Sequence, residues 1–485
     1  MLKCQGRRRR SNVSGEPQSA SFLASLMNSN PAVIVIGAGV AGLAAACQLG
    51  RAGFGVHIVE ARDRIGGRVL THIDPGCGCP IEFGAEFIHG KPPELWQLLR
   101  KANAEITEVE GDAWCVEDGQ LTSCGFWEDI DNILEKMDDR RRDESFADFL
   151  DRCCRSPKTQ ANRLAKQRAL GYVSGFNAAD PALVGVHWLV KGMRAEQKIE
   201  GDRAFRARHG YKDLLDVFQQ QLRTYNISVQ LSTVIRRLGW RAGNVELTVT
   251  DPKGESTLEA ARVLITLPLS LLKAAAGKPG VIEFVPELPA QKKNALDKLE
   301  MGKVIRVTLC FRERFWEAVK PPGAGKSLSD MSFLFSQDDW FPTWWTAHPE
   351  KWPIITGWAP FRAGERLSEQ SRSFVEDRCL QALSTLLRVS RSELDVMLEG
   401  AYFHDWQTDP FSMGAYSYGK VGASGAQQAL AEPIENTLFF AGEATDTTGH
   451  NGTVHGAIAS GYRAASQILL AARRALPNSN LSPPC

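Results

Sequence analysis

A glycine-rich segment near residue 40 has the residue types and the spacing that bind a phosphate group. Gly37, Gly39 and Gly42 form the pattern G-x-G-x-x-G. The first glycine permits a tight turn, the second lets the backbone approach a pyrophosphate, and the third allows a helix to pack closely. A helix that begins there directs free N–H groups at the anion. Glu60, eighteen residues beyond Gly42, is placed to accept hydrogen bonds from a ribose. The pattern therefore predicts a dinucleotide site.

The elements that must position these residues can be predicted from the same region. Residues 32–37, AVIVIG, form an apolar run that is typical of a buried parallel strand. Residues 41–53 are rich in alanine and predict a helix that ends at Gly53. Residues 55–62, GVHIVEAR, predict a second strand. Together they form a βαβ unit of about thirty residues.

The glycine motif fits either NAD or FAD, and an arginine-rich turn directly after Glu60 distinguishes between them. Arg62 and Arg68 flank the Gly-Gly turn that contains Gly67. A guanidinium group at such a turn can bind a pyrophosphate through two parallel hydrogen bonds. The sequence EARDRIGGRV resembles the signature of the flavin-containing amine oxidase family, which includes monoamine oxidases, polyamine oxidases, L-amino-acid oxidases and lysine-specific histone demethylases. The resemblance implies that the dinucleotide is FAD.

Other segments extend the resemblance over almost all of the chain from residue 31 to about residue 470. Residues 81–90 resemble the segment that passes the flavin, residues 227–234 the strand that contacts adenine, and residues 440–443 the segment beside the ribityl phosphate. Residues 452–457 resemble the start of a helix whose dipole faces the flavin pyrimidine, where negative charge develops on reduction. The resemblance implies these cofactor-binding residues: Gly37, Gly39, Gly42, Glu60, Arg62, Gly67, Arg68, Gly84, Ala85, Val234, Trp358, Gly442, Glu443, Thr453 and Val454.

The walls of the substrate site point to one branch of this family. Tyr416, within residues 406–418, matches the residue that forms one aromatic wall. Monoamine oxidases carry a flavin-linking cysteine directly before that tyrosine, whereas this chain has Ala415, which implies that FAD is bound non-covalently. Thr453 stands where monoamine oxidases have a second wall tyrosine. Polyamine oxidases and histone demethylases are similar to this chain at that position.

His89 is the candidate for proton transfer. It ends a sequence, F-I-H-G, that resembles the W-I-H-G of several polyamine oxidases, in which the histidine lies beside the substrate amine. A neutral imidazole near pH 7 can accept a proton from an ammonium substrate or orient it. The alternative interpretation is a structural histidine whose ring bonds to backbone groups of a tight turn.

Arg306 marks a departure from the family. The family has a lysine here that holds a water against flavin N5, five residues before an aromatic residue, and counting back from Phe311 gives Arg306. Lys303 lies three residues earlier, on the opposite face of a regular strand, unless a bulge changes the register. Arginine keeps its charge because its pKa exceeds about 12, so it can bind water but cannot act as a base. This departure bears on reoxidation by oxygen and on the substrate class, but not on flavin binding.

The resemblance implies an enzyme that oxidises an amine, with polyamines among the candidate substrates. A neutral amine binds between Tyr416 and Thr453, hydride transfer to FAD gives an imine that water hydrolyses, and oxygen becomes hydrogen peroxide. Three alternatives remain open. One is a dehydrogenase or desaturase that uses another electron acceptor, another is an L-amino-acid oxidase with Arg306 or Arg206 at the substrate carboxylate, and the third is an inactive flavoprotein that acts as a binding module. A histone demethylase is disfavoured, because no chromatin-targeting domain or long coiled-coil insertion is recognisable.

A second strand–loop–helix pattern near the C-terminus completes the nucleotide-binding unit only if the chain leaves this domain and returns. We therefore predict an α/β fold, a Rossmann-type FAD-binding domain with an inserted α+β substrate domain. The predicted boundaries are residues 31–90, 220–280 and 435–475 for the FAD domain, residues 91–219 and 281–434 for the substrate domain, residues 1–30 for a disordered leader and residues 476–485 for a tail.

Composition narrows the partners and the compartment. The chain has 485 residues, and its formal net charge of +1 gives no reason to expect nucleic acid or an anionic membrane as a partner. No run of eighteen apolar residues occurs, so no membrane span is predicted. The basic, serine-rich N-terminus is interpreted as a leader of a cytoplasmic protein, with an organellar transit peptide as the alternative. The oligomeric state is not indicated.

The cysteines suggest no metal site. There are eleven, and no C-x-x-C pair has a distant second pair, so zinc is not expected. Free thiols in a reducing compartment are the expectation. A redox pair of Cys77 and Cys79 is the alternative.

Overall fold

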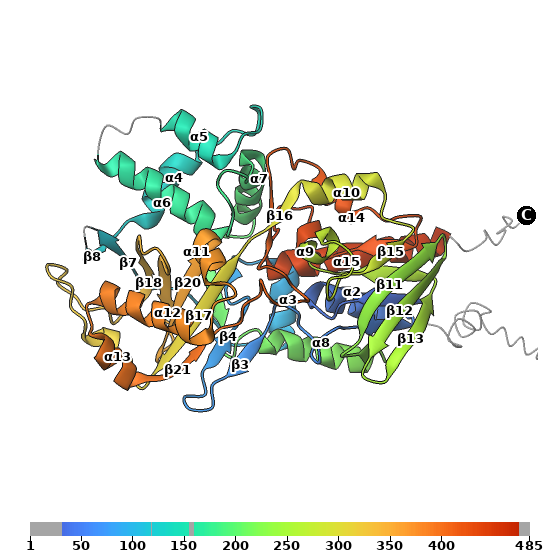
Figure 1. Cartoon of the computed structure of the whole chain (residues 1–485), viewed down its shortest axis with the longest axis horizontal. Helices are drawn as coiled ribbons and strands as arrows, with labels where there is room; N and C mark the ends of the chain where they lie inside the picture. The colour runs from blue at the N-terminus through green and yellow to red at the C-terminus, as the bar shows by residue number, and fades with distance from the viewer. Residues whose placement is uncertain (1–31, 118, 155–159, 475–485) are drawn as a thin grey trace, which may run out of the picture.

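The computed structural model describes residues 32–117, 119–154 and 160–474. The predicted leader and tail, at residues 1–30 and 476–485, lie outside these ranges. Figure 1 shows two lobes side by side, with a group of helices above the left-hand lobe. The N-terminal strand and the C-terminal helix both belong to the right-hand lobe.

The segment around Gly37 folds as a strand, a helix and a second strand. α2 (Val40–Arg51) joins two parallel strands of one five-stranded sheet. The strand order is β10-β2-β1-β14-β23, and every neighbouring pair is parallel. The strands are β1 (Val33–Ile36), β2 (Val56–Val59), β10 (Ser228–Gln230), β14 (Arg262–Ile265) and β23 (Leu438–Phe440). Distant parts of the chain thus build one sheet, which confirms the predicted α/β class with a Rossmann-type unit.

Both faces of this sheet are covered, which explains the uninterrupted apolar run of β1. Val33 and Val35 pack against α2 and α15 (Val454–Arg474) on one face. Ile34 and Ile36 face the opposite way, into a core shared with a four-stranded sheet of order β13-β12-β11-β15. Its strands are β11 (Val234–Arg241), β12 (Asn244–Asp251), β13 (Gly254–Ala260) and β15 (Glu283–Val285).

Helices α3 (Pro93–Lys101) and α8 (Lys212–Thr224) also belong to the core of the five-stranded sheet. Leu99 and Phe218 are fully buried in the same cluster as the alanines of α2. Our predicted boundaries assigned residues 91–219 to the substrate domain, so they leave out α3 and cut through α8. The packing differs because an amphipathic pattern shows that a helix has a buried face, but not which sheet that face covers.

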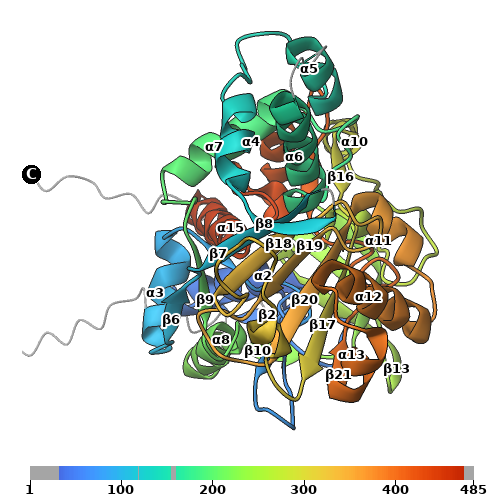
Figure 2. The same cartoon turned by 90° about the vertical axis from the view of Figure 1, so that its left-hand side faces the viewer.

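The second lobe is built on a seven-stranded sheet of order β21-β17-β20-β19-β18-β7-β8. Figure 2 shows α11, α12 and α13 on the right, beside strands β20 and β17 of this sheet. On β17 (Val304–Phe311), the odd-numbered residues share a core with α12, so the even-numbered residues face the first lobe. The other elements are β7 (Asp112–Glu117), β8 (Gln120–Ser123), β18 (Met331–Phe335), β19 (Thr343–Thr346), β20 (Ile354–Pro360), β21 (Leu398–Tyr402), α11 (Phe361–Leu367), α12 (Arg372–Leu387) and α13 (Arg391–Met397).

Shorter elements complete the described chain. The upper helices in Figure 1 are α4 (Phe126–Leu134), α5 (Phe146–Cys153), α6 (Gln160–Phe176) and α7 (Val186–Gln197). The small pairings are formed by β3 (Thr71–Ile73), β4 (Pro80–Glu82), β5 (Ile88–His89), β6 (Ile106–Glu108), β9 (Ala204–Ala207), β16 (Leu299–Met301) and β22 (Ser417–Gly419). The remaining helices are α9 (Leu269–Lys273), α10 (Ala290–Asp297), α14 (Ala426–Ala431), η1 (Phe315–Ala318) and η2 (Glu443–Thr445).

Free thiols were expected for all cysteines, but two of the described cysteines form a disulfide. Cys115 on β7 and Cys124 just after β8 form a disulfide across this hairpin. The expectation was wrong for this pair because hairpin pairing, which brings the two residues together, is not visible in cysteine spacing alone. Seven other described cysteines carry free thiols.

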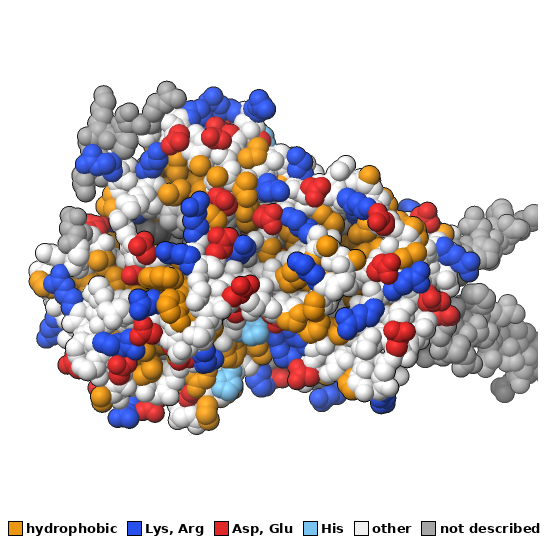
Figure 3. Space-filling view, viewed as in Figure 1, with side chains coloured by type: hydrophobic (Ala, Val, Ile, Leu, Met, Phe, Trp, Pro, Cys, Tyr) orange, Lys and Arg blue, Asp and Glu red, His pale blue; other side chains and the backbone are white. Residues whose placement is uncertain are grey.

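The surface and the helices agree with the composition. Lys and Arg side chains are interspersed with Asp and Glu side chains over most of the face in Figure 3. In the part of the chain that the structure describes, no helix is both long enough and apolar enough to cross a membrane.

Candidate active site

The glycine turn leaves space at the N-terminus of α2. A Cβ atom on Gly42 would lie 2.1 Å from the carbonyl oxygen of Gly37, so close packing requires glycine there. Gly37 itself has a φ of +101°, which favours glycine. At Gly39 a Cβ atom would meet nothing within 4 Å. Because Gly39 caps the helix, this open space lies where its free N–H groups point.

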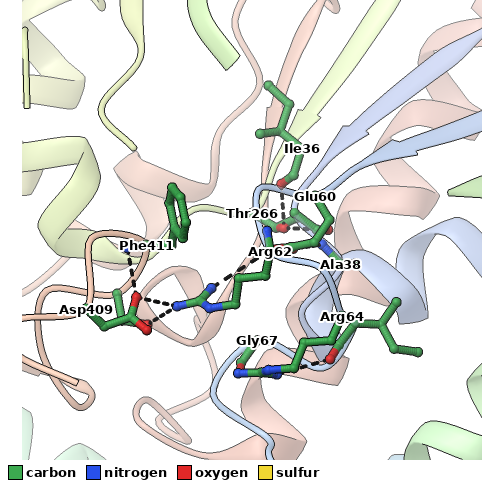
Figure 4. Close-up of polar contacts among 12 residues, drawn as sticks. Ile36, Ala38, Glu60, Arg62, Arg64, Gly67, Thr266, Asp409 and Phe411 are labelled. Atoms are coloured by element: carbon green, nitrogen blue, oxygen red, sulfur yellow. Dashed lines mark hydrogen bonds and ion pairs between the residues drawn. The ribbon is translucent and has the colours of Figure 1, made fainter. Parts of the chain in front are cut away.

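The second glycine pair lies against this turn. Gly66 forms a bridge with Gly39, and a Cβ atom on Gly67 would be 3.2 Å from the Cα of Gly39. The Arg64 side chain donates to the carbonyl oxygens of Ile65 and Gly67 and so fixes the turn (Figure 4). The two glycine segments, separate in sequence, therefore border the same space.

Glu60 lies at the carboxyl end of β2, buried but with defined acceptors. Its Oε2 accepts from the N–H of Ala38 at 2.7 Å and its Oε1 from the N–H of Arg62 at 2.9 Å. Each carboxylate oxygen has a further lone pair for a ribose hydroxyl. The N–H of Thr233 donates to the Glu60 carbonyl oxygen, which places half-buried Val234 beside the same sheet edge. The residues predicted for the adenosine half are thus brought together.

Arg62 has a protein partner that the sequence did not reveal. Its Nη2 donates to Asp409 at 2.6 Å and to Ser412 at 3.0 Å, and its guanidinium lies 5.4 Å from the ring centre of Phe411 (Figure 4). Arginine has five N–H donors, so these bonds through Nη2 leave others for a phosphate. Arg68 also bonds to protein groups through one nitrogen, since its Nη1 donates to the carbonyl oxygen of Ala415 and to Glu443.

Glu443 joins three segments around the predicted flavin end. Its buried Oε2 accepts from the Ser417 hydroxyl at 2.6 Å and from the N–H of Gly452 at 2.9 Å, and its Oε1 accepts from Arg68 at 3.2 Å. The neighbouring Gly442 has a φ of +119°. Glu443 was predicted to bind the cofactor. The structure shows a carboxylate bonded within the protein, which holds the other cofactor-binding segments in place.

The two predicted walls of the substrate site meet at the start of α15. Thr453 caps this helix, because its Oγ1 accepts from the N–H of Gly456 at 2.9 Å, and Val454 is the first helical residue. A Cβ atom on Gly452 would lie 3.2 Å from the Tyr416 ring, so Tyr416 packs directly against this turn. The Tyr416 hydroxyl donates to the carbonyl oxygen of Phe176 at 2.7 Å.

His89 lies among aromatic rings near this position. Its ring centre is 5.2 Å from that of Phe176 and 6.2 Å from that of Phe87. Burial lowers the pKa of His89, while the charge of Glu196 on α7 opposes that shift, so the ring is neutral at pH 7. Within the described ranges no hydrogen bond reaches the His89 ring, which argues against the structural interpretation of this histidine.

Arg306 forms a buried network with a residue that the sequence analysis did not single out. Its Nη2 donates to Glu86 at 2.6 Å, and its Nη1 donates to the carbonyl oxygen of Gly84 at 3.0 Å. Glu86 also accepts from Arg206 Nε at 2.6 Å and from Trp345 Nε1 at 3.0 Å. Burial opposes ionisation of Glu86, but the charges of Arg306 and Arg206 prevail and lower its pKa. Glu86 could have been identified as a site residue from its place in FGAEFIHG, but nothing in the sequence indicated its partners.

The neighbours of this network include three more predicted residues. A Cβ atom on Gly84 would lie 1.9 Å from the Arg68 carbonyl oxygen, which also accepts from the N–H of Ala85 at 3.3 Å. Trp358 on β20 is the cross-strand neighbour of Arg306, and its Nε1 donates to the carbonyl oxygen of Gly175. The segment that was predicted to pass the flavin is therefore held against β17.

Lys303 does not belong to this group. Its side chain is half exposed and pairs with Glu365 at 2.8 Å. It precedes β17, and no bulge brings it to the Arg306 face, because the pairing of β17 with β20 is regular from Val304 to Cys310. The prediction of Lys303 as a catalytic residue is therefore wrong, and Arg306 is the residue of the two that bonds to Gly84 and Glu86.

Comparisons with known proteins agree with this geometry. A family model described as flavin containing amine oxidoreductase matches residues 40–122 and 126–469. The chain is 27% identical over 459 residues to probable polyamine oxidase 4 of Arabidopsis thaliana, which covers 90% of this chain and 86% of that relative. It is 29% identical over 473 residues to polyamine oxidase 5 of Oryza sativa subsp. japonica, an alignment that covers 90% of this chain and 87% of that relative. The solved structure of putrescine oxidase bound to putrescine has the same fold, with a TM-score of 0.74 and 20% identity, covering 91% of this chain and 99% of that one.

Proposed function

This chain belongs to the family of flavin-containing amine oxidoreductases, and we propose that it oxidises a diamine or polyamine and passes the electrons to oxygen. Family membership makes it an FAD-dependent enzyme that oxidises an amine. The polyamine class is supported by the names of its relatives and by the residues around His89. The observation that carries the proposal is a neutral histidine between aromatic rings, with one carboxylate close enough to affect its pKa.

The residues of the first lobe fit FAD. The open space at Gly39 and the N–H groups at the start of α2 suit a pyrophosphate, and Glu60 suits a ribose. Bound FAD supplies the acceptor for the hydride that leaves the amine carbon. Because Ala415 offers no nucleophile before Tyr416, non-covalent binding is part of the proposal.

His89 deprotonates the substrate in this proposal. Amines of this class are cations in water, and an ammonium nitrogen has no lone pair to assist loss of hydride from its carbon. The neutral imidazole accepts that proton as the amine enters. Tyr416 and Phe176 bury the alkyl chain and exclude water, and the hydrogen bond from Tyr416 to the Phe176 backbone holds the two together.

Glu196 provides the reason to prefer a substrate with a second amino group. Its half-buried carboxylate lies 3.8 Å from Nδ1 of His450, and it has no lysine or arginine partner in the described part of the chain. A distal ammonium group would supply the missing cation. An amino-acid substrate is less well matched, because Arg206 and Arg306 both bond to Glu86.

Oxygen is proposed as the electron acceptor because the relatives are named oxidases. Arg306 supplies a fixed positive charge next to Gly84 and Glu86. Such a charge favours the anionic products of oxygen reduction, although arginine cannot act as a base. The side chain therefore replaces the charge of the family lysine but not its ability to exchange a proton.

An anaerobic flavin-bleaching screen tests the proposal. Purified holoenzyme is mixed with putrescine, spermidine, spermine, benzylamine and L-leucine, and the loss of oxidised-flavin absorbance is followed by stopped flow. We expect rapid bleaching by a di- or polyamine and slow bleaching by benzylamine and L-leucine. Admission of air to the reduced enzyme should restore the absorbance and release hydrogen peroxide. Preferential bleaching by L-leucine would overturn the substrate class, and absence of peroxide would overturn oxygen as the acceptor.

A further inference from the structure

Three thiols and one carboxylate meet where the turn between β3 and β4 packs on β17. Asp74, Cys77 and Cys79 come from the turn, and Cys310 comes from the strand. One carboxylate oxygen and the three sulfur atoms all lie within 4.8 Å of one another. Cys79 is fully buried, and Cys310 and Asp74 are 2% and 6% exposed.

We propose that Asp74, Cys77, Cys79 and Cys310 form a structural site for Zn²⁺. The Sγ atoms of Cys77 and Cys310 are 3.8 Å apart. Tetrahedral zinc with Zn–S bonds of about 2.3 Å separates its sulfur ligands by about 3.8 Å. Three sulfurs and one oxygen complete four-fold coordination, and a site closed by four protein ligands is structural rather than catalytic.

The turn holds its three ligands through bonds made by Asp74. The Asp74 N–H donates to the carbonyl oxygen of Cys79 at 3.0 Å, and its own carbonyl oxygen accepts from the N–H of Gly78 at 2.9 Å. Its Oδ1 accepts from the N–H groups of Gly76 and Cys77 at 2.9 and 2.8 Å. Cys77 and Cys79 are thereby fixed on the same turn before any ion binds, which lowers the entropic cost of assembling the site.

The groups around the ligands are those that a zinc site needs. The Tyr402 hydroxyl, from β21, donates to Asp74 Oδ2 and orients the carboxylate. The N–H of Cys79 points at Cys77 Sγ at 3.4 Å and can offset the negative charge of a thiolate. Metal binding requires deprotonated thiols, and such outer bonds help to hold them in that state.

A disulfide does not account for the whole cluster. Any disulfide here uses two of the three thiols, and leaves the third and the carboxylate without a role. Zinc uses all four groups. The site could not be predicted from cysteine spacing, because its thiols come from a C-x-C segment and from a cysteine more than 200 residues away, not from paired C-x-x-C motifs.

The site would join the two lobes close to the active site. The turn belongs to the hairpin that leads to Gly84 and Glu86, and Cys310 lies four residues after Arg306 on the same face of β17. A zinc ion would therefore fix the hairpin to the strand beside the Glu86–Arg306 pair, without contacting substrate or FAD.

Metal analysis of the holoenzyme tests this site. The full chain is purified with reductant and without chelator, and its zinc content is measured by mass spectrometry together with its FAD content. We expect about one zinc per chain in the wild type. We expect the same in a Cys153→Ser/Cys154→Ser variant, whose thiols are 3.0 Å apart but lie outside the cluster. Cys310→Ser should contain almost none.

Cobalt binding by the wild-type chain gives a readout that does not depend on whether variants fold. After zinc removal, Co²⁺ should give a near-ultraviolet thiolate charge-transfer band and the strong visible bands of a tetrahedral site. Tyr402→Phe keeps all four ligands and should weaken metal affinity by about 10- to 100-fold. The proposal is overturned if the wild type contains no zinc and gives no thiolate–cobalt band, if Cys310→Ser retains zinc, or if peptide mapping finds a Cys77–Cys310 disulfide in place of metal.

Discussion

Arg306 and Glu86 show how one side chain can decide the charge of a buried site. Glu86 is bonded by two guanidinium groups and one indole N–H, and the Arg306 side chain is only 7% exposed. Two cations face one carboxylate, so these three buried side chains together retain a positive charge. Removal of Glu86 would leave two buried cations without a counter-charge, whereas removal of Arg306 leaves Glu86 with Arg206 as its remaining cationic partner.

Arg306→Met should therefore reduce the free energy of unfolding by about 1.5–3 kcal/mol, because Glu86 loses one of its two charged hydrogen-bond partners and keeps Arg206. Lys303→Met is the matched control, since Lys303 forms an exposed ion pair with Glu365 and should cost less than about 1 kcal/mol. Chemical denaturation of both FAD-loaded variants measures the difference. Equal losses would show that the buried network contributes no more than a surface pair.

Glu82 predicts a pH dependence of stability. Burial raises its pKa to about 7, although the N–H of Tyr211 and the Thr71 hydroxyl donate to it. Its folded-state pKa thus exceeds the unfolded value, so its contribution to stability is fully present below about pH 4.5 and is lost as the pH rises through about 7. Glu82→Gln removes the titration, and the stability of this variant relative to the wild type should rise by about 1–3 kcal/mol between pH 5 and 8. Thermal unfolding in this range measures it, and parallel pH profiles would contradict the assignment.

His89 predicts a pH dependence of activity. Its lowered pKa means that kcat/KM for an amine should rise with pH through an apparent pKa below the ordinary value of 6.5, as the imidazole becomes able to accept a proton. His89→Gln should lower kcat/KM by about 10²-fold or more near pH 7. The loss should shrink at high pH, where the substrate is already neutral. A variant whose loss is the same at every pH would indicate a packing role.

At the scale of the element, the start of α2 contains one glycine that the fold requires and one that leaves space for a cofactor. Gly42 is required by packing against Gly37, whereas Gly39 faces open space with an ordinary backbone conformation. The motif predicts these different purposes, and the structure agrees, with close packing at Gly42 and open space at Gly39. At α15, by contrast, the Thr453 cap and the Tyr416 neighbour come from segments that the sequence could assign only by resemblance.

Gly39→Ala should leave the stability of the FAD-free protein unchanged within about 1 kcal/mol and weaken FAD binding at least about tenfold, because the new methyl group occupies the space for the pyrophosphate. Gly42→Ala should instead destabilise the protein with or without FAD, because its Cβ would lie 2.1 Å from the Gly37 carbonyl oxygen. Thermal unfolding and fluorescence titration with FAD compare the two. Loss of stability in apo Gly39→Ala would contradict the open space.

How much the sequence predicts depends on how far apart the interacting residues lie. The βαβ unit, Glu60 and the glycine turn could be predicted because a local pattern specifies them. The Arg306–Glu86 and Arg62–Asp409 pairs could not, since their partners are 220 and 347 residues apart and any acidic residue satisfies the pattern equally well. The Cys115–Cys124 disulfide could not be predicted for another reason, because it depends on the pairing of β7 with β8.

At the scale of the whole molecule, the two lobes are joined beside the proposed FAD site. The segment at Gly84 bonds to Arg306 on β17. Ordering of this segment by FAD should therefore also stabilise the second lobe. Trp114, Trp316 and Trp344 are fully buried in the core of that lobe and report on it by fluorescence.

FAD at about 100 times its dissociation constant should stabilise the protein by about 2.7 kcal/mol. Tryptophan fluorescence should show the same shift as far-ultraviolet circular dichroism, which averages over the helices of both lobes. Two thermal transitions, with only one sensitive to FAD, would show instead that the lobes unfold independently.

The strand order β10-β2-β1-β14-β23 has a consequence for synthesis of the chain on the ribosome. The outer strand β23 and helix α15, which covers α2, emerge after the other four strands of this sheet. Until then β14 remains an unpaired edge and the alanine-rich face of α2 stays exposed, so the nascent domain is open to aggregation. FAD capture is therefore a late event, because it has to wait until β23 and α15 have been synthesised.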